Sequence, residues 1–193
     1  MITAPEQIVT RRLLLRKPVR ADAGPFAESL TRDPDVMRYM MWRTGPEAAD
    51  AEEFVASSLE HWRRGTSFTW SIVLRAEGVF AGVFEARVDA YMVNVAYAIG
   101  RAHWNNGFAT EALRAVCAWT DAQKDVFRVW AVCAAGNPAS VRVLEKAGMT
   151  REGTLRRWAV FPHLSGEPQD CFSYARVRES TEESSPRPAS VIL

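Results

Sequence analysis

The feature that most constrains the fold is an apolar strand that runs through a glycine-containing turn into a helix. The run Met92–Ile99 predicts the strand, and Trp104–Ala112 follows it as Trp-Asn-Asn-Gly-Phe-Ala-Thr-Glu-Ala. The first N–H groups of such a helix have no intrahelical acceptor, and the helix dipole attracts anions to that end. Gly107 lets a ligand approach closely, because it lacks Cβ and tolerates positive φ. The junction predicts a phosphate-binding turn, although a glycine at this place also serves packing alone.

A second polar motif lies further along the chain, again directly after an apolar strand. The segment Asn137–Met149 reads Asn-Pro-Ala-Ser-Val-Arg-Val-Leu-Glu-Lys-Ala-Gly-Met. Together the two motifs resemble the GNAT superfamily of acyl-CoA-dependent N-acyltransferases, and within it the ribosomal-protein N-terminal acetyltransferases. That branch typically reads Tyr-Trp-Gly-x-Gly-Tyr-Ala-Thr-Glu-Ala, then Asn-x-x-Ser-x-Arg-Val-Leu-Glu-Lys-x-Gly-Phe. The likeness covers most of Thr10–Arg178.

Length and composition fit a single folded domain. The 193 residues, of which 48% are apolar, suffice for one domain with a sizeable core. The net charge of +1 lacks the basic excess of a nucleic-acid binder. No stretch is long enough to span a bilayer, and Met1–Gln7 does not have the pattern of a signal peptide. We therefore expect a cytoplasmic protein without nucleic-acid or membrane partners.

The cysteines predict neither a disulfide framework nor a metal site. Cys117, Cys133 and Cys171 are odd in number and widely spaced, without a Cys-x-x-Cys pair. Cys117 and Cys133 lie in apolar surroundings and are expected to be buried packing residues. Three unpaired thiols agree with a reducing compartment.

Hydrophobic periodicity predicts an alternation of strands and helices. Strands are expected over Arg11–Val19, Phe68–Arg75, Val79–Val88, Met92–Ile99, Arg128–Ala135, Thr150–Val160 and Asp170–Arg178. Helical segments are expected over Ala21–Leu30, Asp33–Met41, Pro46–Arg64 (capped by Thr44), Thr110–Lys124 and Pro138–Lys146. The turn Ala76-Glu77-Gly78 predicts a hairpin, so the strands that flank it are expected to be antiparallel.

This order of elements matches the GNAT acyl-CoA N-acyltransferase fold, an α/β (α+β) arrangement. In that fold a mixed, mostly antiparallel central sheet is flanked by helices. Residues 1–178 are expected to form one N-acetyltransferase domain. The polar, proline-containing segment 179–193 predicts a disordered tail.

The resemblance implies that acetyl-CoA lies in a cleft where two central strands, Met92–Ile99 and Arg128–Ala135, separate. The backbone around Tyr97 and Ile99 would pair with the pantetheine amides in the manner of an added strand. The pyrophosphate would lie on the turn, whose implied cofactor-binding residues are Trp104, Asn105, Asn106, Gly107, Phe108, Ala109 and Thr110. Trp104 stands where the superfamily has Arg or Gln, a departure that the ribosomal branch shares.

The second motif supplies further candidates. Asn137 matches the asparagine that binds the pantetheine region, and it equally suits a helix N-cap. Arg142 is a candidate for the adenosine 3′-phosphate, although a solvated helix arginine has the same pattern. The superfamily's tyrosine acid is replaced by Leu144, so the resemblance leaves Ser140 as the thiolate stabiliser or proton donor. The alternative for Ser140 is a hydroxyl that bonds back to helix carbonyls.

A clear general base is missing from the sequence. Asn94 occupies the position where the branch often carries a glutamate. Glu85 on the neighbouring strand is a candidate that acts through ordered water, and an exposed strand carboxylate is the alternative. Asp170, with Tyr174 four residues later, matches an Asp-x-x-x-Tyr pattern that the branch places near the acceptor amine.

The predicted function is transfer of an acetyl group from acetyl-CoA to a primary amine, above all an N-terminal α-amine of a protein or peptide. An α-amine loses its proton more readily than a lysine, which suits a weakly equipped site. One alternative is a small acceptor such as a polyamine, an amino acid or an antibiotic. The other is a CoA-binding module without turnover. Another acyl-CoA donor is not excluded by the sequence, and the resemblance allows a homodimer.

The acceptor side is the least patterned part of the chain. The loops Arg38–Gly45 and Phe161–Gln169 are expected to surround the acceptor by resemblance. An acidic cleft mouth would favour a small cationic acceptor, and the acidic residues Glu47, Asp50, Glu52 and Glu53 are candidates for it. Such charges also fit an ordinary solvated helix face.

Overall fold

The protein folds around one eight-stranded sheet. The structure, a computed structural model, describes residues 2–42 and 48–178. The strands are β1 (Gln7–Val9), β2 (Leu13–Arg16), β3 (Ser67–Leu74), β4 (Phe80–Asp89), β5 (Met92–Ile99), β6 (Arg128–Ala134), β7 (Thr150–Val160) and β8 (Pro168–Val177). The helical elements are η1 (Arg20–Asp22), α1 (Ala23–Phe26), η2 (Ala27–Thr31), α2 (Pro34–Met37), α3 (Ala48–Arg64), η3 (Arg101–His103), α4 (Phe108–Asp121) and α5 (Pro138–Lys146).

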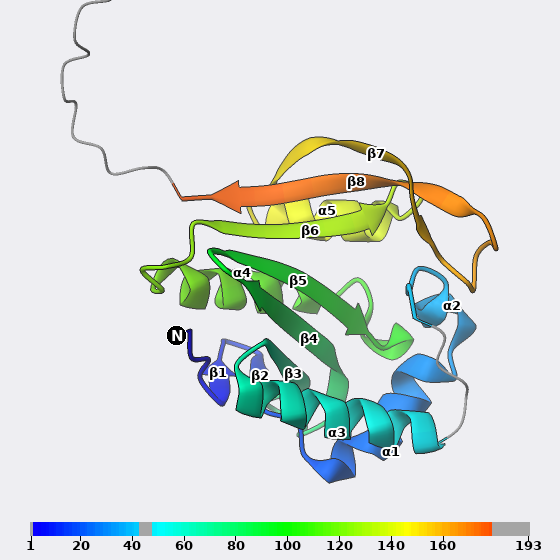
Figure 1. Cartoon of the computed structure of the whole chain (residues 1–193). Helices are drawn as coiled ribbons and strands as arrows, with labels where there is room; N and C mark the ends of the chain where they lie inside the picture. The colour runs from blue at the N-terminus through cyan, green and yellow to red at the C-terminus, as the bar shows by residue number, and fades with distance from the viewer. Residues whose placement is uncertain (1, 43–47, 179–193) are drawn as a thin grey trace, which may run out of the picture.

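The sheet confirms the predicted fold class. Its strand order is β1-β2-β3-β4-β5-β6-β8-β7 (Figure 1). Every neighbouring pair is antiparallel except β5 and β6, which run parallel. The expected hairpin joins β3 and β4. The sheet is therefore mixed and mostly antiparallel.

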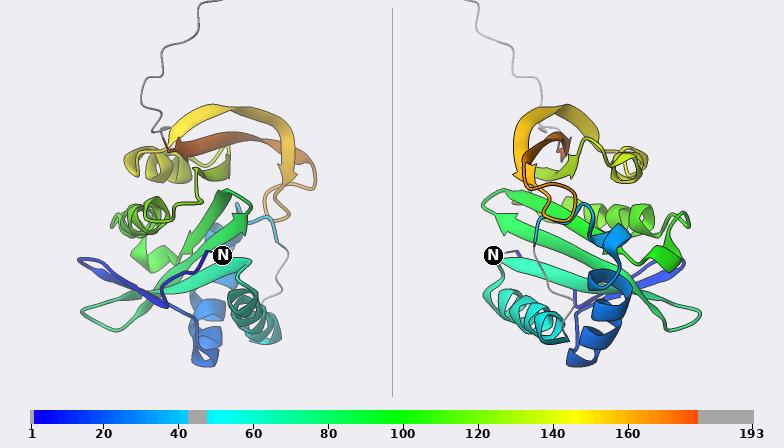
Figure 2. Two further views of the ribbon diagram at one scale, coloured as in Figure 1. Left: turned by 60° about the vertical axis from the view of Figure 1, so that its left-hand side comes forward. Right: turned by 90° about the vertical axis from the view of Figure 1, so that its right-hand side faces the viewer.

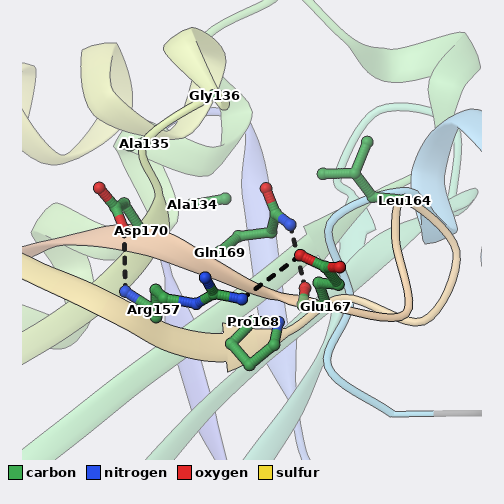
Figure 3. A pocket seen from close by; sticks show the side chains of 9 residues that line it. All are labelled: Ala134, Ala135, Gly136, Arg157, Leu164, Glu167, Pro168, Gln169 and Asp170. Atoms are coloured by element: carbon green, nitrogen blue, oxygen red, sulfur yellow. Dashed lines mark hydrogen bonds and ion pairs between the residues drawn. The ribbon is translucent and has the colours of Figure 1, made fainter.

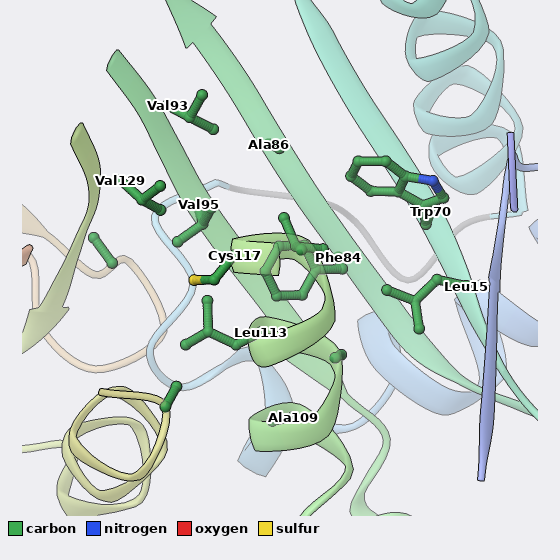
Figure 4. Close-up of a cluster of buried hydrophobic side chains, with 14 of the residues drawn as sticks. Leu15, Trp70, Phe84, Ala86, Val93, Val95, Ala109, Leu113, Cys117 and Val129 are labelled. Carbon is green, nitrogen blue, oxygen red and sulfur yellow. The ribbon is translucent and has the colours of Figure 1, made fainter. Parts of the chain in front are cut away.

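Helices cover the sheet on two faces, because alternate side chains of each strand point to opposite sides. On one face α4 packs Leu113 and Cys117 against Phe84 and Val95 (Figure 4). On the other face α1, η2 and α3 pack around Val83 of β4 (Figure 2). β3 and most of β4 are thus buried on both sides, whereas buried and half-buried residues alternate along most of β5 and β6.

The N-terminal strand prediction needs correction. The strand expected over Arg11–Val19 is present only as β2, and β1, which was not predicted, precedes it and pairs with it as a hairpin. The reason is a turn at Thr10, whose N–H and hydroxyl both donate to the carbonyl of Leu13. This turn separates the two strands and brings Thr10 toward α4.

The ends of the helices also differ from those that the hydrophobic periodicity predicts. The helix expected over Thr110–Lys124 begins two positions earlier at Phe108, because Gly107 is its N-cap. The helix expected over Pro46–Arg64 is described from Ala48 onward, so its predicted cap Thr44 lies outside the described residues. The predicted tail, 179–193, also lies outside them, and its disorder stays a prediction. Among the described helices, none has the length and apolar character needed to cross a membrane.

A buried charge pair joins β2 to η1 beneath the sheet. The Arg16 guanidinium donates to both carboxylate oxygens of Asp22, at 2.7 and 2.6 Å. The Ser71 hydroxyl and the Val19 N–H also donate to Asp22 Oδ2, at 2.7 and 2.9 Å. Burial alone would raise the pKa of Asp22, but these hydrogen bonds outweigh it and leave the pKa below its usual value. Asp22 is therefore a charged residue inside the fold.

Candidate functional site

The two parallel strands begin as neighbours and then separate. Their ladder contains only the pairs Met92–Arg128, Val93–Val129 and Asn94–Trp130. Beyond that point β5 stays paired with β4 as far as Ile99, and β6 stays paired with β8 as far as Ala134. Within the described chain, no ladder bond joins the facing edges of these two segments. The predicted cleft lies at this place, and its edges offer backbone groups to a ligand.

The turn after β5 has a fixed and unusual backbone. Gly107 has φ 76 and Asn105 has φ 61, both in the left-handed region. The amide of Asn106 donates to the carbonyls of His103 and Trp104, at 3.3 and 3.0 Å. These bonds close the turn, so the side chain of Asn106 serves the turn itself.

Trp104 turns back onto the strand. Its indole N–H donates to the carbonyl of Ile99 at 2.7 Å. This bond leaves only the second lone pair of the Ile99 carbonyl for a cofactor. The tryptophan thus closes the turn with its side chain, at the position where the superfamily carries Arg or Gln.

The N-terminus of α4 meets the conditions for anion binding that the sequence predicted. The N–H groups of Phe108, Ala109 and Thr110 have no acceptor within the helix, and Gly107 provides no capping side chain. A Cβ at Gly107 would lie 3.6 Å from Nη2 of Arg12, so a cation stands beside the glycine. The free N–H groups and the helix dipole favour a phosphate at this turn, and the nearby guanidinium is paired with Glu111.

A clamp from the N-terminal hairpin holds this helix end. Glu111 Oε1 accepts from the Thr10 hydroxyl at 2.6 Å and from the Arg12 N–H at 2.9 Å. Its Oε2 accepts from Nε of Arg12 at 2.7 Å, and the guanidinium lies over the Phe108 ring, 4.7 Å from its centroid. Burial would raise the pKa of Glu111, but the bonds from Thr10 and Arg12 lower it. Sequence reasoning missed this clamp, because its partners lie far apart in the chain.

The candidate base Glu85 is already engaged. Its Oε1 accepts from the Ser67 hydroxyl at 2.8 Å and from Nε of Arg87 at 2.9 Å. Arg87 also donates to the side-chain oxygen of Asn94 at 3.2 Å. The Asn94 amide donates to the carbonyl of Trp130 at 3.3 Å, at the point where the strands separate. A polar chain therefore crosses the sheet to the apex of the cleft, and the base role of Glu85 stays a prediction.

The first turn of α5 reaches the cleft from the side of β6. Asn137 is the N-cap, and its side-chain oxygen accepts from the N–H of Ser140 at 3.1 Å. The Ser140 hydroxyl lies 2.9 Å from the hydroxyl of Tyr97 on β5. Arg142 is exposed on the same helix, and Leu144 is buried in the core. The capping interpretation of Asn137 is confirmed, while its contact with pantetheine stays a prediction.

A cavity of about 430 Å³ opens at the end of β6 (Figure 3). Its walls are formed by Ala134, Ala135, Gly136, Arg157, Leu164, Glu167, Pro168, Gln169 and Asp170. Asp170 Oδ1 accepts from the N–H of Arg157 at 2.8 Å, and Arg157 has a φ of 46. The Arg157 guanidinium pairs with Glu167 at 3.3 Å. The structure thus places Asp170 in a cavity of mixed charge beside the cleft.

The two expected acceptor loops meet at this cavity. The hydroxyl of Tyr39 donates to the carbonyl of Gly136 at 2.7 Å, and its ring packs edge-on against Phe161. His163 Nε2 lies 3.3 Å from the carbonyl of Trp42. Residues 43–45 of the first loop lie outside the described residues.

Other candidate residues lie elsewhere in the fold. Tyr174 is buried, and its hydroxyl donates to Glu145 on α5 at 3.1 Å, so it packs between β8 and α5. Asp50, Glu52 and Glu53 lie on α3, which packs against β3 and α1, and none of them lines the cavity. Glu47 lies outside the described residues. Among the described residues, no three acidic, His or Cys side chains gather as metal ligands.

Comparison with known proteins decides the family. A family model described as "Acetyltransferase (GNAT) domain" matches residues 12–150, which is most of the chain. The chain belongs to the GNAT acetyltransferases. GNAT enzymes use acetyl-CoA as their acyl donor.

Similar GNAT proteins support this assignment. A protein of Bacillus subtilis named as an uncharacterized N-acetyltransferase, YnaD, is 28% identical over 152 residues, covering 78% of this chain and 86% of YnaD. The solved acetyltransferase of Salmonella typhimurium, which modifies the N-terminal serine of ribosomal protein L7/L12, superposes with a TM-score of 0.78 at 19% identity. That match covers 90% of this chain and 100% of the Salmonella chain.

A second solved structure is an acetyltransferase of microcin self-immunity. The microcin C7 self-immunity acetyltransferase MccE, in complex with acetyl-CoA and AMP, superposes with a TM-score of 0.79 at 19% identity. The match covers 88% of this chain and 94% of MccE. Both neighbours share the GNAT fold with this chain.

Proposed function

We propose that this GNAT protein transfers the acetyl group of acetyl-CoA to the α-amino group of a peptide or protein N-terminus. The observation that carries the proposal is the end of the β5–β6 ladder at Asn94, together with a cavity at the end of β6 whose carboxylates, Glu167 and Asp170, both have hydrogen-bond partners on Arg157. The cofactor side and the acceptor side then meet near Ser140 and the end of β6. The ribosomal-protein enzyme with the same fold supports this choice of acceptor.

The cofactor is placed by complementarity. The pyrophosphate lies on the N–H groups of Phe108, Ala109 and Thr110, and the pantetheine arm pairs with the free edge of β5 near Tyr97. The thioester then reaches the first turn of α5. There Ser140 stabilises the thiolate that leaves when the amine attacks.

The acceptor is placed in the cavity at the end of β6. A volume of about 430 Å³ is in the range of small-ligand sites, and it accommodates the end of a peptide. The carboxylates of Glu167 and Asp170 attract an ammonium group, and Arg157 beside them limits the total charge. A peptide terminus, with one amine and a polar backbone, fits this mixed lining.

The free-energy cost of removing a proton from the acceptor amine differs between an α-amine and a lysine side chain. The α-amine has a pKa near 8, so making it neutral at pH 7 costs about 1.4 kcal/mol. A lysine side chain with a pKa near 10.4 costs about 4.6 kcal/mol. Glu85 Oε1 accepts from Ser67 and Arg87, and Asp170 Oδ1 accepts from the Arg157 N–H, so both carboxylates already have partners within the protein. The site therefore suits the α-amine.

The proposal predicts which amines release CoA thiol from acetyl-CoA. Peptides with a free N-terminus and no lysine are expected to give rapid release, and mass spectrometry is expected to locate the acetyl group on the α-nitrogen. The matched control is the same peptides with a blocked N-terminus and one lysine, which are expected to react at least tenfold more slowly. Release with a pool of polyamines, amino acids and antibiotics alone would contradict the proposal and indicate a small-molecule enzyme. No release of CoA thiol with any amine, although acetyl-CoA raises Tm, would indicate a binding module.

A further inference from the structure

Three polar side chains meet where the two strands have separated. Tyr97 comes from β5, Cys133 from β6 and Ser140 from the first turn of α5. The Tyr97 hydroxyl lies 2.9 Å from Ser140 Oγ and 3.4 Å from the Ser140 carbonyl oxygen. This contact is a direct bridge across the cleft, and it joins β5 to the helix that follows β6.

The groups in this cluster are neutral at physiological pH. Burial raises the pKa of Tyr97 well above its usual value, although the hydrogen bond with Ser140 works in the opposite direction. Burial raises the pKa of the Cys133 thiol to about 11, again against a contribution from Ser140. Neither side chain is therefore a nucleophile or a ready proton donor. What the cluster offers is hydrogen bonding of fixed direction.

The main chain and the side chain of Ser140 are held from different sides. Asn137 fixes its N–H as the cap of α5. The hydroxyl would otherwise rotate among staggered positions. A phenol is a stronger acid than an alkyl hydroxyl, so Tyr97 is the better donor of the pair. When Tyr97 donates to Ser140 Oγ, the serine proton points to the other side, where the Cys133 sulfur or a bound thioester sulfur accepts it.

We infer that Tyr97 is a positioning residue that directs the Ser140 hydroxyl toward the thioester sulfur. The inference rests on the proposed function and deepens it. In the transfer, the amine nitrogen bonds to the acetyl carbon, the carbon–sulfur bond breaks, and the electron pair goes to sulfur. The amine loses one proton to solvent and the thiolate gains one from solvent. The two hydroxyls only donate hydrogen bonds and end the reaction unchanged.

The direct test uses bound CoA and needs no acceptor. Ser140 stabilises the thiolate form, so it lowers the pKa of the bound CoA thiol, which ultraviolet absorbance measures against pH. Tyr97→Phe removes only the bridging oxygen, and it is expected to raise that pKa by about one unit relative to wild type. The matched control is Tyr174→Phe, which also removes a buried tyrosine's hydrogen bond to α5, but to Glu145 and not to Ser140. It is expected to leave the thiol pKa unchanged.

Kinetics with an accepted peptide provide the second readout. Tyr97→Phe is expected to lower kcat about tenfold with acetyl-CoA Kd within twofold of wild type, and Ser140→Ala to lower kcat about a hundredfold. The double variant is expected to be no slower than Ser140→Ala, because one residue acts through the other. Melting temperatures of Tyr97→Phe and Tyr174→Phe are expected to fall equally.

The outcomes are distinguishable. An unchanged thiol pKa in Tyr97→Phe would overturn the inference, and so would additive kinetic losses in the double variant. A purely structural bridge would lower Tm without moving the thiol pKa. If free N-terminal peptides prove inert while the thiol pKa still responds to Tyr97→Phe, the proposed acceptor is wrong and the role of Tyr97 stands.

Discussion

Replacing Gly107 by valine is expected to raise the Kd for acetyl-CoA about 30-fold, equivalent to ~2 kcal/mol. Gly107 has φ 76 and ends the turn that opens α4. A branched side chain is strained in that conformation, and its methyl groups would project beside the Arg12 guanidinium, where the pyrophosphate is placed. The loss is therefore in affinity for the cofactor, which isothermal titration measures directly.

The control for strain is Gly148→Val. Gly148 has φ 85 just beyond α5, and a Cβ there would meet nothing within 4 Å. Both variants carry the same conformational cost of about 1–2 kcal/mol, and both are expected to melt at lower temperature. Only the change at Gly107 is expected to weaken the binding of acetyl-CoA. Equal affinities in the two variants would mean that the glycine turn serves packing alone.

The largest effect on stability is expected from Asp22→Asn. This change leaves the Arg16 guanidinium without its buried carboxylate and weakens the bonds from Ser71 and Val19. The free energy of unfolding at pH 7 is expected to fall by about 2–3 kcal/mol. For a chain of this length that lowers Tm by about 5–10 °C. Denaturant unfolding and thermal melting both measure it.

The stabilising contribution of Asp22 is expected to depend on pH in a defined direction. The pKa of Asp22 is lower in the folded protein than in the unfolded chain. Its contribution is therefore complete above the unfolded value near 3.9, and it is lost as the pH falls through the folded value. The difference between wild type and Asp22→Asn is expected to be constant near neutral pH and to shrink below about pH 4.

A surface pair provides the comparison for Asp22. Glu60 accepts from Arg64 one turn away on α3, at 2.7 Å, and the Arg64 side chain is exposed. Glu60→Gln is expected to change the free energy of unfolding by less than about 0.5 kcal/mol. If Asp22→Asn were equally mild, the pair with Arg16 would not be a stabilising part of the core.

Local patterns in the sequence were sufficient to predict the backbone structure of the candidate site. The glycine turn, the start of a helix near Phe108 and the cap at Asn137 depend on residues within one turn of each other. The order of strands and helices also followed from periodicity, and the family resemblance supplied the cleft. Glu85 and Arg87 are two residues apart and lie on the same face of a strand, so their pairing could also have been predicted from the local sequence.

Contacts between segments that lie far apart in the chain could not be predicted from the sequence. The hydroxyl of Thr10 meets Glu111, and the hydroxyl of Tyr97 meets Ser140, because the sheet brings β1–β2, β5, α4 and α5 together. Such pairs depend on strand order and crossing geometry, which no local periodicity encodes. The strand β1 was missed for a related reason, since its hairpin with β2 depends on hydrogen bonds of Thr10 within a tight turn.

The most direct test of the account is a crystal structure of the protein with acetyl-CoA bound. We expect the pyrophosphate on the N–H groups of Phe108, Ala109 and Thr110, and the pantetheine along the free edge of β5. We also expect the thioester sulfur within hydrogen-bond reach of Ser140, with the acetyl group facing the cavity at Asp170. A cofactor bound outside the gap between β5 and β6, or a sulfur turned away from Ser140, would contradict it.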